Sequence, residues 1–435
     1  MDSTADRRDP MSDTDAALRA PRCAGAAFSD FDALPNNVPK GCRWSPDGLC
    51  LLTAGEEDRT LHLFELPEAL LAPRGDSASE GDGTASGAQS ADSLGAEHGG
   101  LRNALRAREG GAIYDYAWYP HMDSTNPATC CFLSSSKDHP LHLWDAYTGA
   151  CRASYVAYNH LDEVVAAHSL AFDPSGGRIF TGFERTIRVF DLARPGRQCE
   201  VRPTCATRRS RDGQRGIISC FAFAPDGSGL YAAGSYGGTI GLYADSDPRR
   251  VIMELGGEPT SGGVTGLAFS QDSLLLYTGA RRDGALCCWD VRRNGVLLAR
   301  FERACPTNQR IGFELLGSAS EGLLSASQDG RVLAYATAQP EEPPTTLLTF
   351  SDATNAATMH PWLPLLAVAA GERHFTLPTG DGSPLIKRKA GATHDHGAEL
   401  AVLEENGTHN ELDGDSARWQ NGLSVWVMPW QQQST

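Results

Sequence analysis

The chain has 435 residues, of which 41% are hydrophobic, so it is long enough for several domains or for one large repeat array. Its formal net charge of −16 excludes a broad basic surface of the kind that binds duplex DNA without sequence preference. The 46 glycines and 25 prolines favour many tight turns over long helices.

The N-terminal segment is polar, with seven acidic and four basic side chains in residues 1–32. It contains no apolar signal-peptide core, and no apolar run in the chain approaches the ~18 residues of a membrane helix. We expect a disordered tail over residues 1–32 of a soluble, intracellular protein. The 12 cysteines include no CxxC pair and no Cys/His cluster with zinc spacing, which favours reduced thiols and no metal site.

A short strand pattern of alternating apolar residues that ends in an aromatic residue occurs seven times. A strand of small residues precedes each copy, and before that comes an apolar strand that closes in a turn such as "SPDG". Several copies are 46 residues apart, and the seven closing aromatic residues are Phe64, Trp144, Phe190, Tyr243, Trp289, Tyr335 and Trp426.

This pattern predicts a four-stranded unit repeated seven times. One such sheet cannot bury both of its faces, whereas sheets stacked around an axis cover one another. The sequence therefore predicts an all-β, seven-bladed WD-repeat β-propeller over residues 33–430, followed by a tail at 431–435. Two unrelated β-sandwiches are the alternative, and the fixed order of seven paired motifs argues against them.

Two insertions interrupt the repeats and are predicted to be disordered because they are acidic and poor in hydrophobic residues. One spans 68–109, between blades one and two, and the other spans 372–421 and splits the inner hairpin of the last blade. The stretch 395–415 has seven acidic residues and no Lys or Arg. With residues 1–32 these segments carry −10 of the net charge, so the propeller itself can hold basic patches.

No catalytic motif is present: we find no phosphate-binding loop, nucleophile elbow or HExxH. The strands expected to line the channel bring no acid, base or metal set together, and His168 is expected to make structural hydrogen bonds. The sequence therefore predicts a binding scaffold, not an enzyme, with no cofactor and no metal.

The loops divide into two sets in such a blade. Loops that leave the outer strand and loops between the two middle strands share one face, here called the top face, while the Pro-Asp-Gly turns lie on the other. The segment from Arg202 to Arg215 has five arginines and one aspartate. The candidate RNA-binding residues on the top face are Lys137, Tyr158, Asn159, His160, Arg185, Arg208, Arg209, Arg211, Arg215, Tyr236, Arg281, Arg282, Asn308, Gln309 and Arg310.

Arginines interleaved with aromatic and amide side chains suit unpaired RNA. Guanidinium groups bind phosphate or a guanine edge, aromatic rings stack on bases, and amides read base edges. The alternative for the arginines is an ion pair with an aspartate of a neighbouring blade, above all at Arg185 and Arg282. Arg208, Arg209 and Arg211, in an irregular loop, are better explained as solvated or as ligands of phosphate or an acidic protein.

At these residues the sequence resembles the telomerase Cajal body protein family. The stretches "IYDYAWY", "AYNHLDE", "ARPGRQCEV", "YAAGSYGGTIGLYA" and "TNQRI" carry the resemblance, which covers roughly residues 40–360. The chain departs from the family in a much shorter N-terminal leader and in the two divergent insertions.

The resemblance implies a nuclear protein of Cajal bodies that binds the CAB box of H/ACA-type small Cajal body RNAs and telomerase RNA. It also implies H/ACA proteins such as dyskerin as partners, the telomerase reverse transcriptase through the ribonucleoprotein, and folding by the cytosolic chaperonin. No membrane and no duplex DNA are expected as partners. A protein-only adaptor that binds peptides, or a ubiquitin-ligase substrate receptor, is the alternative function.

Overall fold

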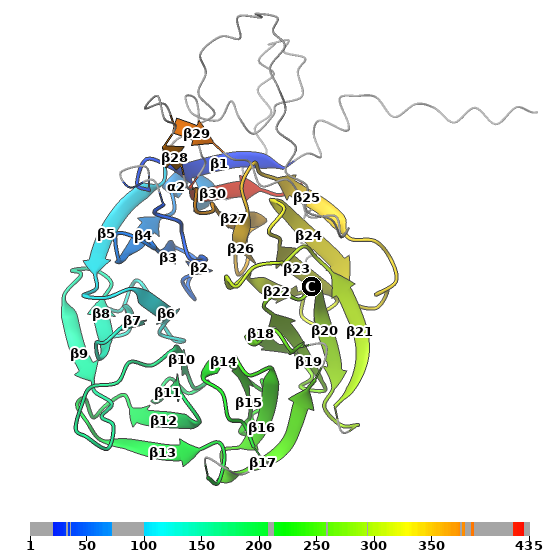
Figure 1. Cartoon of the computed structure of the whole chain (residues 1–435). Helices are drawn as coiled ribbons and strands as arrows, with labels where there is room; N and C mark the ends of the chain where they lie inside the picture. The colour runs from blue at the N-terminus through cyan, green and yellow to red at the C-terminus, as the bar shows by residue number, and fades with distance from the viewer. Residues whose placement is uncertain are drawn as a thin grey trace, which may run out of the picture.

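Seven four-stranded antiparallel sheets surround a central axis in the computed structural model of this chain, which confirms the predicted propeller (Figure 1). The structure describes residues 21–31, 34, 36–71, 100–207, 213–257, 260–293, 295–374, 376–378, 384–386 and 421–429. No helix among them is long and apolar enough to cross a membrane.

From the axis outward, the four strands of each blade are here called the inner, second, third and outer strand. The first three blades contain β2 (Arg43–Trp44), β3 (Cys50–Ala54), β4 (Thr60–Glu65) and β5 (Arg102–Arg108); β6 (Ile113–Trp118), β7 (Cys131–Ser136), β8 (Leu141–Asp145) and β9 (Cys151–Tyr155); and β10 (Ser169–Phe172), β11 (Arg178–Phe183), β12 (Thr186–Asp191) and β13 (Cys199–Pro203).

The remaining blades follow the same order. They contain β14 (Ile218–Phe223), β15 (Leu230–Ser235), β16 (Thr239–Ala244) and β17 (Asp247–Gly256); β18 (Val264–Phe269), β19 (Leu275–Ala280), β20 (Ala285–Asp290) and β21 (Val296–Glu302); β22 (Phe313–Leu316), β23 (Gly322–Ala326), β24 (Arg331–Ala336) and β25 (Thr345–Thr349); and β26 (Thr354–Met359), β27 (Leu365–Ala370), β30 (Gly422–Val427) and β1 (Arg22–Ala27).

The core lies between the blades, because apolar residues on facing sheets pack together there. Phe180 and Val189 of blade three, for example, form one buried cluster with Tyr231 and Tyr243 of blade four. Burial of one such side chain contributes about 1.5–3 kcal/mol. This packing holds the loops at the two ends of each blade in fixed positions around the axis.

The last blade is closed by a strand from the opposite end of the chain. β1 pairs antiparallel with β30, and Phe31 is fully buried behind it, against the His62 ring. The expectation of a disordered tail over residues 1–32 is therefore wrong for residues 22–31. The segment "RCAGAA" was missed because its small residues suffice for an outer strand that packs on one side only.

The insertion predicted at 68–109 is also too long. Its first residues form the short helix α2 (Glu68–Leu71), and its last residues form β5, the outer strand of blade one. Three arginines on the exposed side of β5 made this strand resemble a polar linker. Residues 72–99, where the prediction of disorder also falls, lie outside the described residues.

The second insertion joins β27 to β30, so it divides the middle hairpin of the blade and not the inner one. Within it, β28 (Thr376–Pro378) and β29 (Pro384–Ile386) pair with each other, in contrast to the predicted disorder. Residues 387–420, including the acidic stretch 395–415, and the tail 431–435 lie outside the described residues.

A buried polar network joins strands within blade two. Trp144 donates its indole N–H to Ser134 Oγ at 2.7 Å, and Ser134 and Ser136 donate to the Glu109 carboxylate, Ser136 at 2.8 Å. The His142 ring lies 3.1 Å from the same carboxylate. Burial alone would raise the pKa of Glu109, but these hydrogen bonds outweigh it and leave the pKa lowered.

Candidate functional site

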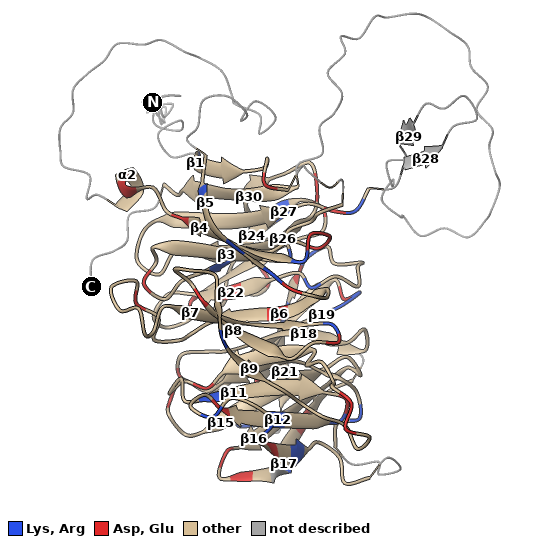
Figure 2. Ribbon diagram, turned by 90° about the vertical axis from the view of Figure 1, so that its left-hand side faces the viewer, with Lys and Arg blue, Asp and Glu red and all other residues tan. Residues whose placement is uncertain are grey.

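The candidate residues that the structure describes lie in loops assigned to the top face, because each loop either follows an outer strand or joins a second strand to a third. Neighbouring loops are tied by backbone hydrogen bonds. The Arg185 amide donates to the Gly216 carbonyl at 3.0 Å, and the Arg282 amide donates to the Thr307 carbonyl at 3.1 Å. The loops therefore form one supported surface, although Lys and Arg alternate there with Asp and Glu (Figure 2).

A cluster of aromatic and basic side chains, here called the mouth cluster, lies where the top face meets the channel. It consists of Tyr114, His168, Tyr236, Arg281 and Arg310. The Arg281 guanidinium carbon lies 4.1 Å from the centroid of the Tyr236 ring, and the buried Arg281 Nε has no hydrogen-bond partner among the described residues. The Tyr114 and His168 rings stack 5.0 Å apart at an interplanar angle of 23°.

His168 thus has a different role from the expected one. It makes no side-chain hydrogen bond within the described part of the chain, and its half-buried ring lies flat on Tyr114 instead. Burial lowers the pKa of His168, and burial raises that of Tyr114 with help from Asp138 and Tyr236. The two rings are therefore uncharged at neutral pH and offer a flat surface suited to a base.

Arg310 spans the channel. Its side chain, from the loop that leads into blade six, donates to the Asp115 carboxylate of blade two at 3.0 Å and to the Ser219 carbonyl of blade four at 2.6 Å. Arg43 of blade one reaches the same carboxylate at 3.3 Å. Burial would lower the pKa of Arg310, but the Asp115 carboxylate reverses this effect and leaves it raised. Arg310 thus has a structural role, because its guanidinium joins blades two and four, and it also belongs to the mouth cluster.

Asp115 and Arg43 were missed in the sequence. Asp115 accepts hydrogen bonds from both arginines and from the Tyr116 and Leu170 amides, which explains how a buried carboxylate is tolerated. The signal available was an aspartate inside the apolar strand "IYDYAW", a residue type that is rarely buried without a partner.

Four of the predicted cations have no carboxylate partner among the described residues: Lys137, Arg215, Arg281 and Arg282. Arg185, by contrast, pairs with Glu184 at 2.8 Å. Arg185 therefore makes an ion pair within its own turn, whereas the predicted alternative, a pair with an aspartate of a neighbouring blade, is found neither for Arg185 nor for Arg282 among the described residues. Arg208, Arg209 and Arg211 lie outside the described residues.

Arg202 does not belong to the basic loop. It is buried in β13, where it pairs with Glu200 at 2.8 Å and with Asp245 of the next blade at 2.9 Å.

The candidates Asn308 and Gln309 lie in the loop that carries Arg310. Asn308 is exposed and Gln309 is half-buried, and the Gln309 amide donates to Thr307 Oγ1 at 3.1 Å.

Several top-face turns hold an arginine in the left-handed region. Arg59 and Arg185 have φ values of 56°, whereas the turns of blades four and six have Gly238 and Gly330 at the equivalent place, just before the third strand. Arg282 has a φ of 53° in the turn of blade five. A side chain in this region costs about 1 kcal/mol relative to glycine. Arg59 was missed in the sequence, where its turn position was the available signal.

The loop "AYNHLDEVV" does not join the mouth cluster. No contact within the described part of the chain connects Tyr158, Asn159 or His160 to Tyr236 or Arg281. The Tyr158 ring instead contacts Arg197, which lies in the turn between β12 and β13. The Arg197 guanidinium carbon is 4.7 Å from the centroid of the Tyr158 ring. The prediction that Tyr158, Asn159 and His160 share one RNA-binding surface with the channel residues is thus not supported by their contacts.

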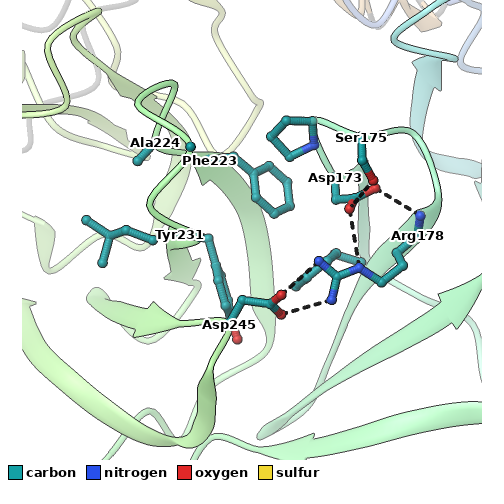
Figure 3. A pocket seen from close by; sticks show the side chains of 12 residues that line it. Asp173, Ser175, Arg178, Phe223, Ala224, Tyr231 and Asp245 are labelled. Carbon is teal, nitrogen blue, oxygen red and sulfur yellow. Dashed lines mark hydrogen bonds and ion pairs between the residues drawn. The ribbon is translucent and has the colours of Figure 1, made fainter.

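A hollow of about 190 Å³ lies on the opposite face, between blades three and four (Figure 3). Phe180, Phe223 and Tyr231 line it, and Arg178 beside it donates to the Asp245 carboxylate at 3.0 Å. Because Arg178 is bound by Asp245 and also by Asp173, its charge is already neutralised within the protein. We assign this hollow to the packing of the two blades.

One group of possible metal ligands was not expected from the sequence. Asp352, Glu372 and His374 bring one ligand atom each within 4.8 Å of one another, and His374 Nε2 lies 3.2 Å from Asp352 Oδ2. Glu372 and His374 make further interactions, so a hydrogen-bonded network explains the grouping and no metal is assigned to it.

Comparison with known proteins gives two kinds of match. The family described as WD domain, G-beta repeat matches residues 206–243 and 249–290. Telomerase Cajal body protein 1 of Rattus norvegicus is 44% identical over 370 residues, which is 84% of this chain and 64% of that protein. The Homo sapiens protein of the same name is 44% identical over 407 residues, or 92% of this chain and 67% of that protein.

A more distant relative extends the comparison. Telomerase Cajal body protein 1 homolog of Drosophila melanogaster is 35% identical over 348 residues, which is 79% of this chain and 58% of that protein. The chain therefore spans a little under two thirds of the length of the rat and fly relatives.

Proposed function

This chain belongs to the telomerase Cajal body protein family, and we propose that it is an RNA-binding scaffold whose top face recognises an unpaired RNA loop. The proposed ligand is the CAB box of H/ACA-type small Cajal body RNAs and of telomerase RNA. In this role the protein directs these RNAs to Cajal bodies in the nucleus and supports assembly of the telomerase ribonucleoprotein. The proposal includes no enzymatic activity.

The mouth cluster is the observation that carries this proposal. The Arg281–Tyr236 pair at 4.1 Å combines a cation with an aromatic ring, and the Tyr114–His168 stack adds a second flat surface. A stacked base is worth roughly 1–3 kcal/mol, and a bidentate contact from arginine to a base edge contributes about as much. Two or three such contacts are sufficient for a short motif on a protein of negative net charge.

The exposed cations around the cluster add a phosphate-binding rim. Lys137, Arg215 and Arg282 have no carboxylate partner in the described part of the chain, so binding of phosphate breaks no ion pair there. Phosphate contacts position an RNA without reading its sequence, whereas contacts with bases supply specificity. We therefore assign the rim to affinity and the mouth cluster to choice of sequence.

The proposed partners follow from the same role. They are H/ACA proteins such as dyskerin, the telomerase reverse transcriptase through the ribonucleoprotein, and the cytosolic chaperonin during folding. A protein-only adaptor is the competing function. Crosslinking of the tagged protein in cells distinguishes the two, because recovery of no small nuclear RNA would favour the adaptor.

The direct test is the affinity for an RNA hairpin with a CAB-box loop, measured by mobility shift at fixed salt. Arg281→Glu is expected to weaken binding about 10- to 100-fold, since it removes a contact worth roughly 1–3 kcal/mol and adds a repulsive charge. Arg293→Glu is the matched control, because Arg293 is an exposed arginine on the opposite face. Equal affinities of both variants and the unmodified protein would contradict the proposal.

A further inference from the structure

Three exposed cations surround the segment that leads from β5 into β6, and they are here called the basic ridge. They are Arg59 and Arg108 of blade one and Lys137 of blade two. Backbone hydrogen bonds hold their turns against this segment: the Glu109 amide donates to the Arg59 carbonyl at 2.8 Å, and the Lys137 amide donates to the Ala112 carbonyl at 2.8 Å. The ridge is therefore one supported surface.

The two glycines of this segment are required by the close approach of the next turn. A Cβ atom at Gly111 would lie 2.2 Å from the Lys137 carbonyl oxygen, and one at Gly110 would lie 2.2 Å from Nε2 of His139. The Arg59 guanidinium donates to the Gly110 carbonyl at 3.3 Å. Because neither glycine has a side chain, the cations border a low strip of backbone that a ligand can approach closely.

The cations of the ridge have no carboxylate partner within the described part of the chain, whereas other arginines of β5 do. Arg102, at the opposite end of the strand, pairs with Glu65 at 3.4 Å. Arg106 pairs with Asp30 at 2.5 Å. Arg108, at the end on the top face, is exposed without such a pair, so binding of phosphate there breaks no ion pair.

Two exposed carboxylates belong to the surrounding turns. Burial raises the pKa of Tyr114 and the Asp138 charge adds to this effect, which places Asp138 toward the channel mouth. The Glu57 amide donates to Asn37 Oδ1 at 3.1 Å, on the inner side of its turn, whereas the Arg59 guanidinium reaches outward to the segment after β5. The outer side of these turns therefore has an excess of positive charge.

The ridge differs from the mouth cluster because it offers no exposed ring for a base to stack on. No large hydrophobic side chain of its described turns is exposed. His139 is half-buried, and its Nδ1 lies 2.7 Å from the Lys137 carbonyl oxygen. Cations without stacking rings suit the phosphates of base-paired RNA, whose bases face inward, better than they suit unpaired nucleotides.

We propose that the basic ridge binds phosphates in the paired stem of the RNA whose unpaired loop occupies the mouth cluster. Arg108 of the ridge and Tyr114 of the mouth cluster are six positions apart in one segment, so their Cα atoms are separated by at most about 22 Å. One hairpin can therefore contact both. This inference rests on the proposed function and assigns the loop and the stem of the RNA to two parts of the top face.

The test compares two RNA ligands at fixed salt: a hairpin with a CAB-box loop, and a linear oligonucleotide of the loop sequence alone. The tested variant combines Arg59→Gly with Arg108→Gln. Gly238 and Gly330 take the place of Arg59 in two other blades, so glycine preserves this turn. We expect the double variant to weaken hairpin binding about 10- to 100-fold in 0.1 M salt, and to leave binding of the linear oligonucleotide within about twofold.

Arg102→Gln is the matched control, because Arg102 is 80% exposed on the same strand but at its opposite end. It should change neither affinity. The salt dependence gives a second readout, since each lost phosphate contact lowers the slope of log affinity against log salt concentration by about 0.9. For the hairpin, the double variant should therefore reduce this slope by about 2, and Arg102→Gln should not change it.

Two results would overturn the inference. Unchanged hairpin affinity in the double variant would show that the stem does not lie on the ridge, and equal losses for both ligands would show that the ridge binds unpaired nucleotides. Failure of the proposed function has a different signature: the unmodified protein would bind the linear oligonucleotide no more tightly than one of scrambled sequence, whatever the double variant does to the hairpin.

Discussion

The ion pair across the channel permits a quantitative prediction for Arg310→Met, which keeps much of the side-chain length and removes the charge. The side chain is 33% exposed and that of Asp115 only 5%, so the loss falls mainly on a buried carboxylate. Removal of one partner from a buried pair costs about 3–5 kcal/mol. Asp115 retains Arg43 and two amide donors, so we expect the lower end, about 3 kcal/mol of unfolding free energy.

The assay is urea unfolding of three single variants and one double variant. Arg194→Met is the control, because Arg194 is 74% exposed and its pair with Asp191, at 3.4 Å, should contribute less than about 1 kcal/mol. In the double variant Arg310→Met with Asp115→Asn, the cost should be smaller than the sum of the single costs by about 1–3 kcal/mol. If Arg310→Met destabilised the protein no more than Arg194→Met, our account of Asp115 would be refuted.

Two further predictions concern the pH dependence of stability and the strained turns. The lowered pKa of Glu109 contributes stability above its ordinary value of about 4.5, and this contribution is lost as the pH falls through the folded value, so Glu109→Gln should flatten the loss of unfolding free energy below pH 4.5. An unchanged slope in pH-dependent urea unfolding would argue against the network around Glu109. Arg282→Gly and Arg282→Ala should weaken RNA binding equally in a mobility-shift assay. The glycine variant should nevertheless be about 1 kcal/mol more stable than the alanine variant, because glycine adopts a positive φ without strain. Equal stabilities would show that this turn stores no strain.

The inner three strands of every blade were predictable from the sequence, because three strand patterns of apolar or small residues recur seven times in the same order. β1 and β5 were not, for a physical reason: an outer strand has only one neighbour and one packed face, so it needs few apolar residues. The exposed side of β5 carries Arg102, Arg106 and Arg108. Such a run of exposed arginines occurs in outer strands and in polar linkers alike, so the sequence alone did not distinguish the two.

The candidate site was predictable as a set of loops but not as a set of contacts. Arg310 and Asp115 are 195 positions apart and meet only because the ring brings blades two and six to opposite sides of one channel. No local pattern contains that information. The loop 157–165 is a different case, since Asn159 four residues before Glu163 is a local signal for a side-chain-capped turn that could have been recognised.

Blade seven draws its outer strand from one end of the protein and its other three from the far end, and this order has a consequence for biosynthesis. β1 leaves the ribosome before the other strands of the propeller, whereas its partner β30 follows about 400 residues later, at Gly422 against Arg22. At roughly 5–20 residues per second that delay is on the order of tens of seconds. During this delay blade one lacks its complete neighbour, blade seven, and the apolar surface that the two blades later bury is exposed to other nascent chains. Enclosure in the cytosolic chaperonin during this interval would protect that surface, which is a physical reason for the proposed dependence on the chaperonin.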